Sequence, residues 1–324
     1  MTRLRRELVS LIEQGAIPPD QVAQAVSASG LYPSPRSWGV FFDRLLLWLG
    51  ALALACAVLF FIAYNWVEMG RWLRFGLVQV ALVSAVAIGI WGKASPLLAR
   101  VALTSASLLV GVLLALFGQV YQTGADPWQL FSVWAIFILP WVWVARFDVL
   151  WLAWLALLNL TLWLYFRTWG GVLGVMFTSG PAVLWGLFLL NTTALVVWEL
   201  GVWHQRWGGR WAVRLLVLGS GIPITLIMLI LVSASHFAFA PVVMVYPLWL
   251  AALYGVYRYW RPDLFMLAGG CVSLITVITL LLARFLLWEG DWQAGNLLLL
   301  AIAVLALGAG AVVWLKRLHE EGVQ

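Results

Sequence analysis

Long apolar runs alternate with short polar breaks along most of this 324-residue sequence. We count ten such runs between residues 42 and 315. A helix needs roughly 20 apolar residues to cross about 30 Å of hydrocarbon, and most of the runs are close to that length. They are continuous, whereas the strands of a membrane barrel would alternate at every second residue. The pattern therefore predicts an all-α, polytopic transmembrane helical bundle.

The expected spans are, in chain order, 42–63, 73–92, 97–117, 128–144, 149–166, 181–200, 212–232, 241–257, 264–287 and 295–315. The fourth and fifth are short, and only the segment from Ala145 to Asp148 separates them. A count of eight or nine spans therefore stays open beside the count of ten.

The composition excludes a soluble fold. Hydrophobic residues make up 64% of the chain and charged residues 10%, whereas a soluble domain carries about 25% charged residues. The net charge of +6 comes from short basic clusters between apolar runs, which is typical of membrane orientation and not of nucleic-acid binding. Cys56 and Cys271 fall inside expected spans without a CxxC motif, so we interpret them as buried core residues.

The basic residues also predict an orientation. With ten spans and a cytoplasmic N-terminus, 15 of the 19 Lys and Arg residues fall in inner segments and 4 in outer segments. The outer four are Arg71, Arg74, Arg167 and Arg284. Because Lys and Arg accumulate in cytoplasmic loops, this division predicts that both termini are cytoplasmic.

The N-terminal polar segment carries two amphipathic stretches. The apolar stripe of the first consists of Leu4, Leu8, Leu11 and Ile12. Gly15 is placed to end that helix, and Pro18–Asp20 begins the second. We expect a short cytosolic helical hairpin and linker over residues 1–37, with Tyr32–Ser37 as the linker, and a transmembrane domain over residues 38–324. The hairpin would offer a contact for a protein partner; a basic helix on the membrane surface is the alternative.

Three short motifs make the first part of the chain resemble a known family. They are LIEQGAIPPDQ at residues 11–21, FIAYNW at 61–66, and GQVYQTG at 118–124, the last followed by Trp128. Over about the first 145 residues, the chain resembles a bacterial family of predicted membrane proteins catalogued as domain of unknown function 2157. The resemblance implies a multi-pass protein of the bacterial inner membrane, and it implies no reaction, cofactor or catalytic residue.

Common catalytic and metal-binding motifs are absent from the sequence. His204, His236 and His319 are too far apart for a helical metal pair, and there is no GxSxG or phosphate-loop motif. Glu199 lies within the inner edge of the expected span 181–200, and we expect a solvated interfacial pair with Arg206. We therefore expect a protein that is not an enzyme and that holds no cofactor or metal.

Polar residues gather in the expected outer loops, above all in the stretch 116–134, which contains no Lys or Arg. Gln119 and Tyr121 directly follow an apolar run, so we place them at headgroup depth, where polar groups need protein partners or water. The residues of this candidate outer-face polar pocket are Asn65, Glu68, Gln119, Tyr121, Gln122, Asp126 and Arg284.

Within that pocket, Arg284 needs a partner because its apolar run continues beyond it. Glu289 and Asp291 lie past the helix end in water, where an ion pair contributes little. Asp126 is a good N-cap candidate next to a proline, so its carboxylate has another task. We therefore expect Glu68 as the first partner of Arg284 and Asp126 as the second.

Small and polar residues inside the spans indicate helix packing. Asn159 and Asn191 each lie near the middle of a span, and we expect a hydrogen bond between their helices. Small residues recur at helix-packing spacing at Ala81, Ala85, Gly89, Ser107, Gly111, Ala306 and Gly310.

Two classes of function fit these patterns. The first is a non-enzymatic scaffold or envelope-associated component in the lipid bilayer. The second is a transporter of small solutes or lipids with an outer-facing polar cavity. A packed bundle favours the scaffold, and a continuous polar cavity that reaches mid-depth favours the transporter.

Overall fold

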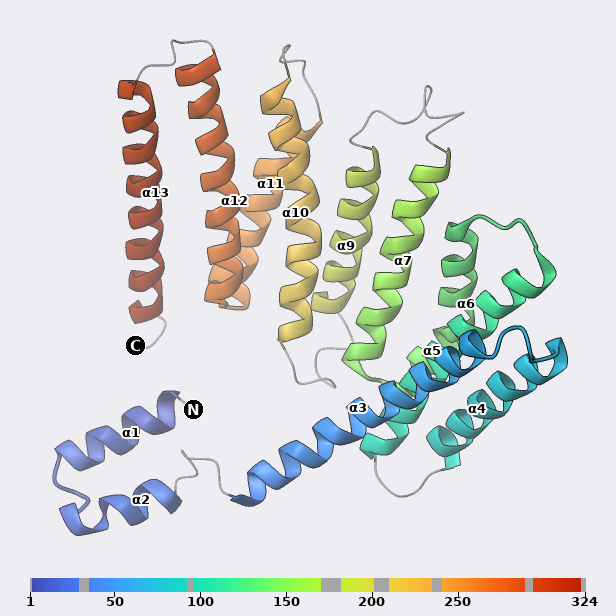
Figure 1. Ribbon diagram of the computed structural model, residues 1–324. Coiled ribbons are helices and arrows are strands. Elements are labelled where there is room, and N and C mark those ends of the chain that lie inside the picture. The colour runs from blue at the N-terminus through green and yellow to red at the C-terminus, as the bar shows by residue number, and fades with distance from the viewer. Residues whose placement is uncertain are drawn as a thin grey trace. The chain divides into compact units, whose positions relative to one another are not determined.

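The computed structural model describes residues 2–28, 35–91, 96–169, 182–200, 210–234, 241–288 and 294–321 (Figure 1). Within these ranges the chain forms helices and no strand, which confirms the all-α prediction. The helices belong to two compact units, Met1–Val120 and Tyr121–Gln324. The boundary between the units lies inside the polar GQVYQTG motif.

The first unit begins with short helices. Its elements are α1 (Thr2–Glu13), the 3₁₀ turn η1 (Pro19–Gln21), α2 (Val22–Ala28), α3 (Pro35–Tyr64), α4 (Arg71–Trp91) and α5 (Pro96–Tyr121). Gly15 follows α1 with φ +70°, and its N–H donates to the carbonyl of Ile12 at 3.1 Å. This confirms Gly15 as the residue that ends the first helix. The pairing of α1 and α2 as a cytosolic hairpin stays a prediction.

The expected linker is too long at its C-terminal end. α3 begins at Pro35, so the end of the segment Tyr32–Ser37 is helical. Proline is well tolerated at the first helical position because its missing N–H would have no partner there. Residues 29–34 lie outside the described ranges.

A small buried core joins the ends of α3, α4 and α5 in the first unit. Its buried members are Ile62, Met69, Val78 and Leu116. In the turn after α3, the backbone N–H and the side-chain amide of Asn65 both donate to the carbonyl of Phe61, at 3.1 and 2.9 Å. The FIAYNW motif therefore ends one helix and supplies Ile62 to the core that α5 completes.

The small residues in the spans have different roles. A Cβ on Gly89 of α4 would lie 2.7 Å from Cγ of Leu103 on α5, so this glycine permits the close approach that we predicted. A Cβ on Gly310 would meet nothing within 4 Å. The packing prediction is therefore correct for Gly89 and wrong for Gly310 within the described part of the chain.

Cys56 also differs from its prediction. It is exposed in the structure, and Cys271 is half-buried, so neither is a core residue. The outward face of a membrane helix is covered by lipid, which is as apolar as a protein core, and an apolar side chain there needs no protein neighbour.

The second unit contains the longer helices. They are α6 (Pro127–Ala145), α7 (Asp148–Trp169), α9 (Ala182–Leu200), α10 (Trp211–Ser233), α11 (Val242–Gly255), α12 (Leu264–Ala283) and α13 (Ala294–Glu321). π-Helical turns continue α11 as η2 (Val256–Trp260) and α12 as η3 (Arg284–Trp288). Arg146, with φ +45°, separates α6 from α7, so the two short expected spans are distinct helices.

Within the described residues, nine helices are long and apolar enough to cross a membrane. α11, in the eighth expected span, has only 14 residues before η2 continues it. The multi-span architecture is therefore confirmed, and the count of ten stays a prediction.

α10 lies at the centre of the packing in the second unit, against α9, α11 and α12 (Figure 1). Two glycines make this possible. A Cβ on Gly219 would lie 2.9 Å from Oδ1 of Asn191 on α9, and a Cβ on Gly221 would lie 2.9 Å from the indole of Trp249 on α11. The absence of a side chain at both positions lets neighbouring helices approach α10 closely.

Candidate functional site

The middle of the second unit contains the asparagine pair that the sequence predicted. The amide of Asn159 on α7 donates to Oδ1 of Asn191 on α9 at 3.2 Å, and Asn191 donates back to Oδ1 of Asn159 at 2.6 Å. Each amide also donates to the carbonyl four residues earlier in its own helix, that of Leu155 or Leu187. The interhelical hydrogen bond is confirmed, and both N–H donors of each amide bind protein acceptors.

A second polar contact, centred on Ser273 in the middle of α12, joins α10, α11 and α12. The hydroxyl of Ser273 lies 2.6 Å from that of Thr225 and 2.8 Å from that of Tyr246. Thr225 also donates to the carbonyl of Gly221 at 2.7 Å. Each of the three hydroxyls is therefore hydrogen-bonded within the protein, as buried polar groups in lipid require.

Charged residues converge at the end of this unit where α9 finishes and α10 and α12 begin. We call this group the charged cluster, and its members are Glu199, Arg210, Arg214, Tyr257, Arg261 and Asp263. Both acids are buried, with side chains 7% and 3% exposed. A buried acid needs a compensating charge and hydrogen bonds, and the cluster supplies both.

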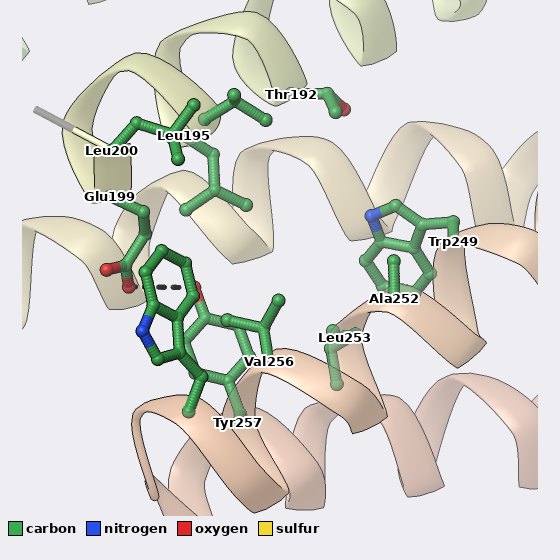
Figure 2. Close-up of a pocket in the computed structure, with 11 residues that line it drawn as sticks. Thr192, Leu195, Glu199, Leu200, Trp249, Ala252, Leu253, Val256 and Tyr257 are labelled. Atoms are coloured by element: carbon green, nitrogen blue, oxygen red, sulfur yellow. Dashed lines mark hydrogen bonds between the residues drawn. The ribbon is translucent and has the colours of Figure 1, made fainter.

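Glu199 is held by two partners. Its Oε2 lies 2.6 Å from Nη1 of Arg261, and its Oε1 accepts a hydrogen bond of 3.0 Å from the hydroxyl of Tyr257 (Figure 2). The expectation of a solvated pair is therefore wrong, because the carboxylate is buried between α9 and η2. Arg206, the expected partner, lies outside the described residues.

Asp263 is the N-cap residue of α12. Its Oδ1 accepts a hydrogen bond of 3.0 Å from the backbone N–H of Phe265. Its carboxylate also lies 3.2 Å from Nε of Arg210 and 3.2 Å from Nη2 of Arg214. One buried carboxylate therefore stabilises the start of α12 and joins it to the start of α10.

Arg210 connects the two acids into one network. Its Nη2 donates to the carbonyl of Arg261 at 3.2 Å, and its Nη1 donates to the carbonyl of Pro262 at 3.4 Å. It therefore holds the short segment between Arg261, which pairs with Glu199, and Asp263. The sequence contains a signal for this site, since both acids lie at the edge of an apolar run and near arginines. We used those arginines only to predict the orientation of the protein in the membrane.

Two clefts flank the charged cluster. The first, of about 200 Å³, lies between α9 and the α11–η2 helix, with apolar walls and Glu199 at one end (Figure 2). The second is larger, about 440 Å³, and is lined by Arg210, Arg214, Arg258 and His319 together with apolar residues of α12 and α13. The ring of Tyr257 contributes to both clefts.

The candidate outer-face pocket divides between the two units. Asn65, Glu68 and Gln119 belong to the first, and Tyr121, Gln122, Asp126 and Arg284 belong to the second. Glu68, Gln119, Tyr121 and Gln122 are exposed. Their assembly into one pocket therefore stays a prediction.

Arg284 has backbone partners. Its Nη1 donates to the carbonyls of Val232 and Ala234, at 2.6 and 2.7 Å, where α10 ends. A cation there is also favoured by the partial negative charge of a helix C-terminus. Asp126 is the N-cap residue of α6, as predicted, and its N–H donates to Oε1 of Gln129 at 3.2 Å. The pairing of Arg284 with Glu68 or Asp126 stays a prediction.

Some candidate residues lie outside the described ranges, among them His204, His236, Glu289 and Asp291. Among the described residues, no three His, Cys, Asp or Glu side chains lie together as ligands for a metal ion.

Comparison with known proteins supports the membrane assignment. Residues 10–151 match a family described as "Predicted membrane protein (DUF2157)", which confirms the resemblance noted in the three motifs. The match begins within the last turn of α1, covers the rest of the first unit and continues through α6 into the start of α7. No curated protein and no solved structure matches the chain.

Proposed function

We propose that this protein, whose residues 10–151 match the DUF2157 family of predicted membrane proteins, is a non-enzymatic scaffold of the bacterial inner membrane. One observation carries the proposal. In the middle of the second unit the amides of Asn159 and Asn191 bind each other, and the hydroxyl of Ser273 binds those of Thr225 and Tyr246. Side chains that are used in this way hold helices together, so we interpret them as structural and not as contacts for a solute.

The other clefts among the described spans support the same interpretation. A cleft of about 370 Å³ among α6, α7 and α9 is lined almost entirely by tryptophan and aliphatic side chains. A cleft of about 510 Å³ among α3, α4 and α5 has the same apolar character. Such surfaces suit lipid tails and do not provide a path for water or ions.

The alternative is a transporter, which needs a water-accessible polar cavity at mid-depth. The polar cleft beside the charged cluster is the observation that favours it. That cleft lies where α10 and α12 begin, so it is a feature of the helix ends. We therefore favour the scaffold.

Hydrogen–deuterium exchange of the full protein in lipid nanodiscs tests the proposal. A dry, packed centre predicts that the α10 peptide 219–227 stays protected for hours. The peptide covering α1 serves as the control and should exchange within minutes. Exchange of peptide 219–227 at a rate near that of the control would reveal water at mid-depth and would favour the transporter.

A further inference from the structure

The cleft of about 440 Å³ beside the charged cluster has a strongly basic wall. Three arginines, Arg210, Arg214 and Arg258, line it together with one acid, Asp263. The acid is almost fully buried, whereas the three arginine side chains are 35%, 43% and 27% exposed. The accessible part of the cleft is therefore positive.

Two of these arginines retain donors that the described residues do not use. Arg214 donates to Asp263 through Nε and Nη2, and its Nη1 has no hydrogen-bond partner among the described residues. Arg258 donates to Glu321 through Nη2 alone. Its Nε and Nη1 have no hydrogen-bond partner in the part of the chain that the structure describes, and the guanidinium lies 5.8 Å from the ring centre of Tyr259. A guanidinium offers five N–H donors in a fork that fits carboxylate and phosphate oxygens.

The cleft lies at the level of a membrane–water interface. Trp211 at the start of α10 and Trp260 at the end of η2 are exposed there, as in the aromatic belts of membrane proteins. Leu264 and Phe265, the first residues of α12, line the cleft and are also exposed. An arginine wall thus adjoins an apolar wall that faces the bilayer.

We propose that this cleft binds the phosphate group of an anionic phospholipid. Arg214 and Arg258 would donate to the phosphodiester oxygens, and the glycerol and upper acyl chain would lie along Phe265. Basic pockets between transmembrane helices bind anionic headgroups by this chemistry. The site lies at the helix ends and does not depend on the scaffold proposal.

A free phosphate ion shares the anionic oxygens but not the apolar part. The apolar wall at Leu264 and Phe265 therefore favours the lipid as the source of the phosphate. Glu321 acts as an internal competitor, because its Oε2 lies 2.6 Å from Nη2 of Arg258. Removal of this exposed carboxylate should strengthen the binding of an anion.

Native mass spectrometry of the purified full chain tests the proposal with two lipids of identical acyl chains, phosphatidylglycerol and phosphatidylcholine. We expect the wild type to bind phosphatidylglycerol more tightly than phosphatidylcholine. Arg258→Gln should weaken phosphatidylglycerol binding about fivefold, the effect of one basic residue near a lipid surface. Glu321→Gln should change the affinity in the opposite direction, which a purely structural ion pair would not do.

Arg317→Gln is the matched control. Arg317 is exposed on the same end of α13 and does not line the cleft, so its replacement should leave the affinity unchanged. Equal losses in Arg258→Gln and Arg317→Gln would show a diffuse charge effect and overturn the proposal. So would equal binding of the two lipids. Displacement of phosphatidylglycerol by millimolar inorganic phosphate would identify a phosphate-ion site and overturn the lipid assignment; failure to displace it supports the lipid.

Discussion

Asn159 and Asn191 exchange hydrogen bonds between their side-chain amides, and Gly219 of α10 packs directly against Asn191. Three helices, α7, α9 and α10, therefore meet at one polar contact inside an apolar unit. A hydrogen bond between membrane helices contributes about 0.6 to 2 kcal/mol. The contact also fixes how far α7 is shifted along α9, because both hydrogen bonds form only when the two asparagines lie at the same level.

The first prediction concerns this pair. Asn159→Leu and Asn191→Leu should each lower the free energy of unfolding in detergent, because each leaves one amide without its partner. The double variant should lose less than the sum of the single losses, with a coupling of about 0.6 to 2 kcal/mol. Additive losses in this cycle would show that the two amides do not stabilise each other.

The second prediction concerns Gly219. A Cβ there would lie 2.9 Å from Oδ1 of Asn191, so Gly219→Ala should destabilise the protein by about 1 to 3 kcal/mol. The control is Gly310→Ala on α13, where a Cβ would meet nothing within 4 Å. Thermal unfolding of the two variants should show a loss for the first alone. A similar melting temperature for both would contradict the close approach of α9 and α10.

The third prediction concerns Glu199. Arg261→Gln should cost about 3 to 5 kcal/mol, because it leaves a buried carboxylate without its compensating charge. The double variant with Glu199→Gln should recover much of that loss. Arg258→Gln is the control, since its ion pair with the exposed Glu321 contributes about 0 to 1 kcal/mol. Chemical unfolding in detergent measures all four proteins, and a failure of the double variant to recover would refute the buried pair.

Some of these features could be predicted from the sequence, and others could not. The helices, the break between α6 and α7, and the asparagine pair follow from hydropathy, spacing and depth, which are local properties. The partner of Glu199 does not, because Arg261 is distant in the sequence and resembles every other arginine at a span end. The carbonyl partners of Arg284 were missed for a different reason, since an inventory of side chains contains no backbone acceptors.

The fourth prediction concerns Glu68 as the expected acidic partner of Arg284. If Glu68 also contacts this guanidinium, Arg284→Ala should destabilise the wild type more than it destabilises a Glu68→Gln background. The carbonyls of Val232 and Ala234 alone predict equal losses in the two backgrounds. Unfolding of the four proteins in detergent therefore decides whether the two units meet at this residue.

The fifth prediction concerns orientation. The division of basic residues predicts that both ends of the sequence lie in the cytoplasm. Reporter fusions at Thr2 and at Gln324 should therefore both give a cytoplasmic signal. Signals from opposite sides would mean an odd number of spans and would contradict the count of ten. α11, whose α-helix has only 14 residues before η2, would then be the first helix to question.

The most direct test of the scaffold proposal is the reactivity of a thiol placed in the middle of α10. Cys56→Ala and Cys271→Ala give the background, and Ser220, which is completely buried, is replaced by Cys. Ser233→Cys, exposed at the end of the same helix, is the control. A membrane-impermeant maleimide, applied to right-side-out and to inverted vesicles, should label residue 233 and leave residue 220 unmodified. Labelling of residue 220 from either side would reveal a water-filled path to mid-depth and contradict the scaffold.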